Sequence, residues 1–348
     1  MRMPLGLRGK LAAAFLSILL PVLGVLIYDY LDNYGRLLDT LANGQARTTQ
    51  TLGTFLEATL DQGVAVGQAI ALDPEVRNLS SGNPSRLDAH LAAYLSAFPR
   101  FLDINVWDAA GNNAGASSPP PPGQPRPSIA DREHFREAVS TGKPAISGVI
   151  ISRIGGHPTA AVAAPIRDLQ GRIIGVVTLL VNFDAVVDSL RSISLGPDRA
   201  AWATDRSGRA AFLSTNPALS WEARDLSWYK PVQAALSQGR FIGPVDSSPL
   251  GGPRLDTCMA TPTYGWIVGI SLAQTAYQTA ASQTLASRMG IYMGILPLAG
   301  LIALWSIHAI TRPLGALAQT MAAFGRGELD SRAEVKTGDE LETTAETF

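Results

Sequence analysis

The sequence has little thiol or imidazole chemistry. Its 348 residues include one cysteine, Cys258, and four histidines. A single cysteine excludes an intrachain disulfide framework and a zinc site built from several thiolates. We therefore interpret Cys258 as a small apolar residue of a buried strand, and we expect neither a metal nor a cofactor.

The sequence also lacks an excess of charge and the short motifs of common enzymes. Its 28 basic and 29 acidic residues give a formal net charge of −1, so no basic surface is indicated and we expect no nucleic-acid partner. It contains no P-loop, no H-E-x-x-H and no G-x-S-x-G. We assign no catalytic residue within residues 1–348, and whether the parent protein is an enzyme stays open.

Long apolar runs, in contrast, are present near both ends. Residues 11–28 carry no charged side chain, and residues 289–311 carry none beyond the titratable His308. Each run is long enough for a hydrocarbon core about 30 Å thick. We predict transmembrane helices at 11–29 and 289–311.

The charges beside the first run predict its orientation. Three basic residues lie within residues 1–10 and acidic residues follow the run. By the positive-inside rule, residues 1–10 and 312–348 are cytoplasmic and residues 30–285 are extracytoplasmic, in a multi-pass protein of the inner (cytoplasmic) membrane. A cleaved signal peptide is the alternative, but GVLIYDYL has bulky residues where a cleavage site needs small ones.

The segment between the runs changes its period along the chain. From Tyr30 to Leu72, apolar residues recur near helical spacing with no proline, which predicts a long helix. A second helical pattern, RLDAHLAAYLSAF, follows. Later runs such as FLDINVWD, AISGVIIS and RIIGVVTLLV are rich in β-branched residues and predict strands.

Three Asp-x-x-Gly turns, beginning at Asp108, Asp168 and Asp205, join β-rich runs. Helical patterns at residues 131–139 and in WYKPVQAALSQ interrupt the strands. We therefore predict an α+β fold with two antiparallel-sheet modules on one stalk helix. The predicted parts are the stalk helix at 30–72, a distal module at about 73–190 and a proximal module at about 191–275.

The phrase DREHFREAVSTGKPAISGVIIS, followed by AAPIRDLQGRIIGVVTLLVNFDAVV, resembles the membrane-distal half of a double Cache sensor domain. The resemblance covers residues 30–285 and is strongest over residues 130–185. It implies two stacked PAS-like folds on a stalk helix, placed outside the membrane. It also implies that the distal module binds a small molecule.

The sequence after residue 311 reads TRPLGALAQTMAAFGRGELDSRAEVKTGDELETTAETF, and it resembles a HAMP linker. Apolar residues step by three and four as in a short coiled coil, so we expect a parallel four-helix bundle from two chains, a homodimer. Thr344 departs from the family pattern, and the second helix is incomplete at residue 348. The residues expected to relay the signal are Pro313, Leu314, Leu317, Met321, Phe324, Glu340 and Leu341.

The resemblance also implies a carboxylate-binding group on the helix that begins near residue 131. In amino-acid-sensing members this helix carries an Arg, a Trp and a Tyr for the ligand carboxylate. Here Arg132 matches the arginine, whereas His134 and Phe135 stand at the other two positions. We expect Arg132 to bind a carboxylate with help from His134, and Phe135 to form an apolar wall.

The family's amino-group site is not retained. Ile150 and Ser152 replace its Tyr and first Asp, and Leu180 replaces its second Asp. The resemblance thus implies a small carboxylate without an α-amino group. Strand alternation places Asp103, Asn105 and Trp107 on the pocket side, and Asp103 keeps the amino-acid alternative open because it could replace the missing carboxylates.

The sequence thus predicts a transmembrane receptor for an extracytoplasmic small molecule, with a missing cytoplasmic output domain. We expect a histidine kinase first, and a diguanylate cyclase or chemoreceptor as the alternatives. A ligand-free ectodomain that dimerises or binds a partner is another alternative. An anchored hydrolase, with His90, His134 or His157 as a base, is disfavoured because no nucleophile signature accompanies these residues.

Overall fold

The computed structural model describes residues 7–78, 84–191, 196, 198–216 and 218–326. The chain divides into two compact units, Leu38–Tyr277 on the one hand and Met1–Leu37 with Gln278–Phe348 on the other. The unit Leu38–Tyr277 contains both β-sheets and the candidate site.

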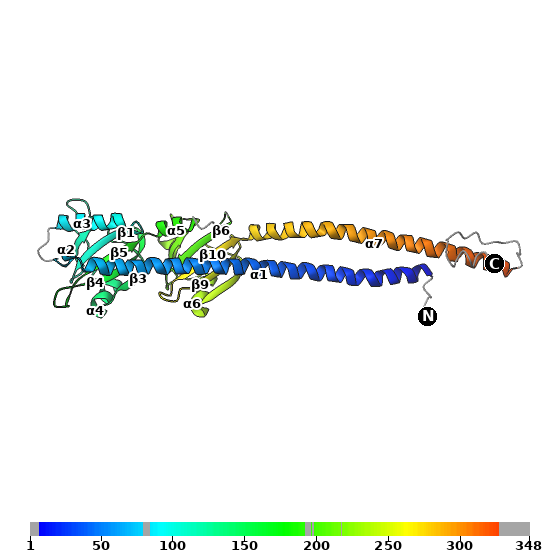
Figure 1. The fold of residues 1–348 in the computed structure, drawn as a ribbon, viewed down its shortest axis with the longest axis horizontal. Coiled ribbons are helices and arrows are strands. Elements are labelled where there is room, and N and C mark those ends of the chain that lie inside the picture. Colours follow the sequence, from blue (N-terminus) through cyan, green and yellow to red (C-terminus); the bar gives the residue numbers. More distant parts are fainter. Residues whose placement is uncertain (1–6, 79–83, 192–195, 197, 217, 327–348) are drawn as a thin grey trace. The chain divides into compact units, whose positions relative to one another are not determined.

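The distal half of this unit is a five-stranded antiparallel sheet of order β2-β1-β5-β4-β3 (Figure 1). Its elements, in chain order, are α2 (Pro74–Arg77), α3 (Pro84–Ala97), β1 (Phe101–Asp108), β2 (Asn113–Ala116), α4 (Glu133–Thr141), β3 (Ala145–Ile151), β4 (Pro158–Arg167), β5 (Ile173–Val181) and α5 (Phe183–Arg191).

The proximal half repeats this topology with the order β7-β6-β10-β9-β8. Its elements are β6 (Arg199–Thr204), β7 (Ala210–Leu213), the 3-10 helix η1 (Glu222–Arg224), α6 (Lys230–Gln238), β8 (Arg240–Val245), β9 (Arg254–Ala260) and β10 (Ile267–Ala273). The predicted α+β fold with two antiparallel sheets is confirmed.

Helix α1 (Leu7–Ala71) packs along both sheets (Figure 1). Its Leu56 and Leu60 have no exposed surface and share one apolar cluster with residues of both modules. Glycine permits a close approach: a Cβ on Gly63 would lie 2.9 Å from Val162 Cγ2. The predicted long N-terminal helix is therefore confirmed, and it is part of a core common to both modules.

The three predicted Asp-x-x-Gly turns are present with one shared geometry. Gly111, Gly171 and Gly208 have φ values of 82°, 81° and 84°, in the left-handed region that favours glycine. In each turn the glycine N–H donates to the main-chain oxygen of the aspartate, and the aspartate Oδ1 accepts two later main-chain N–H groups. The turns therefore fix β1 to β2, β4 to β5 and β6 to β7.

Different helices cover the two faces of each sheet. In the distal module, α3 packs with the C-terminal part of α1 on one face, and α4 packs on the other through Phe135 and Ala138. In the proximal module, α6 packs through Val232 and Ala235 on the face that carries Trp202. Each sheet thus has one face toward α1 and one face toward its own short helix.

No helix in the described part of the chain is both long and apolar enough to cross a membrane. The two membrane helices predicted at 11–29 and 289–311 are therefore not found in the structure, although many of their side chains lie outside the described residues. Residues 289–311 form part of α7 (Gln274–Phe324), which contains Pro313.

The predicted HAMP seam is described only in part. Leu314 and Leu317 lie on α7, where Leu317 is buried and Met321 is 52% exposed. The side chain of Phe324, and both Glu340 and Leu341, lie outside the described residues. The relay role of these residues stays a prediction.

Candidate functional site

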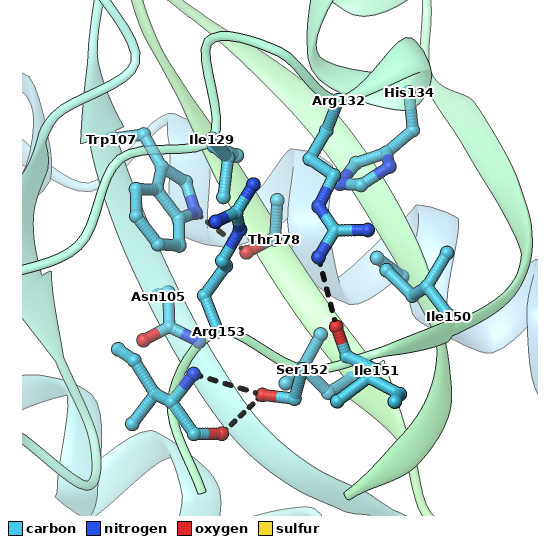
Figure 2. Close-up of a pocket in the computed structure, with 13 residues that line it drawn as sticks. Asn105, Trp107, Ile129, Arg132, His134, Ile150, Ile151, Ser152, Arg153 and Thr178 are labelled. Atoms are coloured by element: carbon cyan, nitrogen blue, oxygen red, sulfur yellow. Dashed lines mark hydrogen bonds between the residues drawn. The ribbon is translucent and has the colours of Figure 1, made fainter. Parts of the chain in front are cut away.

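A small pocket lies on the α4 side of the distal sheet. Strands β1, β3, β4 and β5, the N-terminal end of α4 and the β3–β4 turn contribute to it (Figure 2). The lining residues are Asn105, Trp107, Ile129, Arg132, His134, Ile150, Ile151, Ser152, Arg153, Ile154, Ala161, Thr178 and Leu180.

Arg132 occupies the N-cap position of α4 with extended backbone (φ −79°, ψ 136°). Its Nη2 donates to the main-chain oxygen of Ile151 at 3.1 Å (Figure 2). Its Nε is buried and has no hydrogen-bond partner among the described residues. The neighbouring acid Asp131 pairs instead with Arg153, so within the described residues Arg132 forms no ion pair and keeps an unused donor.

Asn105 lies in the middle of β1 and is only 1% exposed. Its Nδ2 donates to Asp103 Oδ2 at 3.1 Å, whereas its Oδ1 is buried and has no partner among the described residues. The pocket wall therefore contains an unused acceptor as well as the unused donor of Arg132.

Asp103 does not line the pocket, although it is on the predicted strand face. Its carboxylate also accepts hydrogen bonds from Ser117 Oγ and from the main-chain N–H groups of Ile104 and Ser118. Burial raises the pKa of Asp103 above its usual value, and these hydrogen bonds oppose the shift. Asp103 is thus engaged in holding the loop after β2 and in orienting Asn105.

Trp107 and Thr178 form the polar floor of the pocket. The indole Nε1 of Trp107 donates to Thr178 Oγ1 at 2.8 Å (Figure 2). His134, on α4, also lines the pocket, lies beside Arg132 (Figure 2) and is 4% exposed. Burial, with the Arg132 charge as the second cause, lowers the pKa of His134 to about 4, so its imidazole is neutral near pH 7.

The turn after β3 closes the pocket. The main-chain N–H of Ser152 donates to the main-chain oxygen of His157 at 2.9 Å. Ser152 Oγ donates to the main-chain oxygen of Ile154 and accepts from its N–H (Figure 2). The cavity measures about 20 Å³, which is room for one water-sized group. A larger ligand therefore requires this turn or a lining side chain to move.

The charged side chains that line the pocket are of one sign. Arg132 and Arg153 line it, and no Asp or Glu is among the lining residues that the structure describes. Ile129, Ile150 and Leu180 supply apolar surface. The arrangement suits a small anion with an apolar part, and it offers no carboxylate to an ammonium group.

Six of the eight predicted ligand residues meet in this pocket: Asn105, Trp107, Arg132, His134, Ile150 and Ser152. Phe135 lies outside the lining and packs with Trp107 in the apolar cluster beneath α4. Thr178 and Arg153 were not anticipated. Strand alternation could have found Thr178, two residues before Leu180, whereas the position of Arg153 depends on the turn.

The equivalent place in the proximal module is filled by side chains. Tyr229 is the N-cap residue of α6, as Arg132 is of α4, and Trp202 Nε1 donates to Ser271 Oγ at 3.0 Å. The Tyr229 ring packs edge-on against Trp202, with centroids 6.0 Å apart, and its hydroxyl bonds to the fully buried Asp256. The distal module therefore has a small pocket at the place where the proximal module has the side chain of Tyr229.

The unit thus combines two antiparallel sheets on one long helix with a small pocket in the distal module. Residues 27–281 match the family model of the Cache domain, and residues 305–348 match that of the HAMP domain. The chain belongs to the Cache domain family, and the predicted Cache and HAMP resemblance is confirmed.

The curated relatives are chemotaxis proteins. The chain is 19% identical over 350 residues to the methyl-accepting chemotaxis protein McpB of Bacillus subtilis, a match that covers 97% of this chain and 50% of McpB. It is 21% identical over 341 residues to TlpB of the same organism, with 97% and 49% covered. The chain spans about half the length of these relatives.

The similar solved structures are sensor domains. They include the extracellular domain of rpHK1S-Z16 (TM-score 0.59, 18% identity, 69% of this chain and 97% of that chain) and the sensor domain of the V. cholerae histidine kinase DctB (0.52, 16%, 68% and 98%). The ligand-binding domain of the Campylobacter jejuni chemoreceptor Tlp3, in complex with 4-methylisoleucine, is a third (0.50, 12%, 69% and 94%). At these identities the similarity shows the fold.

Proposed function

We propose that the chain is the sensing and relay part of a transmembrane receptor whose distal module binds a small carboxylate without an α-amino group. The observation that carries this proposal is the pocket's charge: two arginines line it and no acidic residue does, among the described residues. An ammonium group there would lie beside two guanidinium groups, with no carboxylate among the described lining residues. The Tlp3 complex contains an amino-acid ligand. This pocket, with its two arginines, would select a different class of ligand.

Arg132 is the proposed anchor for the carboxylate. Among the described residues, its Nε is buried without a partner and its Nη2 donates to a main-chain oxygen at 3.1 Å. A carboxylate that replaced the Ile151 oxygen could accept from both nitrogens, in the bidentate geometry that makes Arg–carboxylate pairs strong. Neutral His134 would then serve as a further hydrogen-bonding group, and Ile150 as apolar wall.

Ligand entry is proposed to open the β3–β4 turn. The Arg153–Asp131 pair, which joins this turn to the residues before α4, is exposed at both side chains (41% and 64%), and such surface pairs contribute little stability. Arg132 must also release Ile151 before a carboxylate can take its place. Ligand binding would thus change the β3–β4 turn from a closed conformation to one that is ordered around the ligand.

The membrane part of the proposal rests on the family and on exposed apolar side chains. Chemotaxis relatives and a HAMP match favour a receptor of the inner membrane. Large apolar side chains on both long helices are exposed, such as Val25 (65%) on α1 and Trp305 (72%) on α7; a soluble surface rarely gathers such groups. We keep 11–29 and 289–311 as proposed spans, with residues 30–285 extracytoplasmic.

The output remains part of the proposal. We propose a homodimer whose HAMP seam repacks when the ligand binds, and an output domain beyond residue 348. The neighbours include sensor domains of a histidine kinase and of a chemoreceptor, while the curated relatives are chemoreceptors. A histidine kinase and a chemoreceptor are thus both supported, and a diguanylate cyclase stays the alternative.

A thermal-unfolding screen of the full 348-residue chain in detergent tests the proposal. Acetate, propionate, succinate and butyrate are compared with L-alanine, L-valine, ethylamine and adenine. At least one carboxylate should raise Tm, and Arg132→Ala should abolish the rise while Arg136→Ala, on the exposed side of the same helix, leaves it intact. A rise with amino acids alone, or a carboxylate response that survives Arg132→Ala, would contradict the assignment.

A further inference from the structure

We infer that Asn105 makes the pocket selective for carboxylates that also carry a hydroxyl group. This inference rests on the carboxylate assignment proposed above and adds a second recognition element to it. Its basis is a buried acceptor, Asn105 Oδ1, that no described residue satisfies.

The amide of Asn105 is held in one orientation. Its Nδ2 donates to Asp103 Oδ2 at 3.1 Å, and Asp103 is itself fixed by the main-chain N–H groups of Ile104 and Ser118 and by Ser117 Oγ. A carboxylate accepts and does not donate, so a flipped amide would place oxygen against oxygen. The amide oxygen is therefore the atom of this pocket-lining side chain that has no partner among the described residues.

Considering the described residues, the wall of the pocket thus contains two unpaired groups of opposite kind, a donor and an acceptor. Arg132 Nε is a donor and Asn105 Oδ1 is an acceptor, and both residues line the same pocket. Buried polar groups in proteins are nearly always paired. Two unpaired groups in the lining of one small pocket therefore point to a ligand that bonds to both. The ligand must accept from Arg132 and donate to Asn105.

The donor on the ligand is a hydroxyl rather than an ammonium. An ammonium would enter a pocket lined by Arg132 and Arg153 with no lining acid among the described residues. The buried carboxylate of Asp103, which bonds to Asn105, already accepts from four donors. A neutral hydroxyl meets the need of Asn105 without adding positive charge.

Matched pairs of acids test this with the full 348-residue chain in detergent, by isothermal titration calorimetry. The pairs are glycolate with acetate, lactate with propionate and malate with succinate, with both enantiomers of each chiral acid. In at least one pair the hydroxy acid should bind about tenfold more tightly or better, because the deoxy acid leaves the buried Oδ1 unpaired. Equal or tighter binding of the deoxy acid in every pair overturns the inference and leaves the carboxylate assignment standing.

Two variants sharpen the test. Asn105→Leu, of similar size, should remove the preference within a pair while the deoxy acid still binds. Asn112→Leu, in the exposed turn after the same strand, should retain the preference. A preference that survives Asn105→Leu overturns the inference, and if that variant fails to fold, the wild-type pairs decide alone.

A comparison with an amine tests whether Asn105 binds an ammonium group instead of a hydroxyl. L-alanine is compared with L-lactate, which has the same skeleton with a hydroxyl in place of the amino group. Tighter binding of L-alanine would assign Asn105 to an ammonium and overturn both this inference and the proposed ligand class. If no carboxylate binds in any arm, the proposed function itself fails and the inference falls with it.

Discussion

The carboxylate of Asp205 accepts a hydrogen bond from the main-chain N–H of Val149 at 2.7 Å. Asp205 belongs to the turn between β6 and β7 of the proximal module, and Val149 belongs to β3 of the distal module. The next residues of β3, Ile150 and Ile151, line the pocket. A movement of β3 on ligand binding would therefore act directly on the proximal module.

Gly148→Ala should disrupt this junction. A Cβ at that position would lie 2.6 Å from Asp205 Oδ2, closer than packed atoms allow, so the carboxylate must move away from Val149. We expect a loss of about 1–3 kcal/mol in the free energy of unfolding, measured by urea denaturation. Gly243→Ala is the matched control, because its Cβ would meet only Phe241 at an ordinary 3.5 Å; equal effects of the two substitutions would argue against the junction.

The same Asp205 shows how far the sequence predicts the structure. Its Asp-x-x-Gly turn could be predicted because the pattern is local: a glycine with positive φ and an aspartate that binds the main-chain N–H groups that follow. Its contact with Val149 could not, because the two residues belong to separate sheets. The sequence did not give the bounds of the run after the Asp108 turn, since Asn-Ala-Gly-Ala has low strand propensity and β2 forms through pairing with β1.

The residues of the candidate site also fall into those that the sequence predicts and those whose role depends on tertiary contacts. Alternation along β1 predicted that Asn105 and Trp107 share a face, and the resemblance predicted Arg132 and His134. That Asp103 orients Asn105 instead of meeting a ligand depends on Ser117 and Ser118, which belong to the chain after β2. When a residue's role depends on contacts with a loop that is distant in the sequence, the neighbouring residues do not reveal that role.

His134 should make the stability of the chain depend on pH. Burial and the neighbouring Arg132 lower its folded-state pKa to about 4, with Asp131 opposing the shift, against an ordinary value of 6.5. The unfolded chain therefore binds a proton first, and stability is lost as pH falls from about 6.5 to about 4. The loss is on the order of 3 kcal/mol.

Urea denaturation at a series of pH values checks this. His134→Gln should flatten the curve in that window, whereas His157→Gln, on the exposed β3–β4 turn, should leave its slope unchanged. If His134→Gln kept the full slope, the imidazole would not be the group that titrates.

Tyr229→Phe tests the filled place in the proximal module. The Tyr229 hydroxyl bonds to Asp256, which is fully buried and whose pKa burial raises. Removing that donor should destabilise the chain by about 1–3 kcal/mol, measured by urea denaturation. The Tm rise with a bound carboxylate should persist, since Tyr229 is remote from the distal pocket; its loss would indicate that the proximal module takes part in binding.

The proposed homodimer predicts a crosslink through the HAMP seam. Met321 lies on the stepped apolar positions of α7 and is 52% exposed, as expected of a seam residue without its partner. Met321→Cys should give a disulfide-linked dimer in membranes on mild oxidation, and a carboxylate ligand should change its yield. Gln319→Cys, also exposed but off the seam, should crosslink less; equal yields would contradict a specific seam.

The proposed topology can be tested with single thiols, because Cys258 does not interfere. It is 1% exposed, its thiol lies 3.3 Å from the Pro231 oxygen, and burial raises its pKa, so it has little reactive thiolate. A cysteine introduced at the exposed Gln124 should react with a membrane-impermeant maleimide in intact cells. One at Gln319 should react only after the cells are permeabilised. Labelling of the Gln319→Cys variant in intact cells, or protection of Gln124→Cys, would rule out an extracytoplasmic sensor joined to a cytoplasmic HAMP linker.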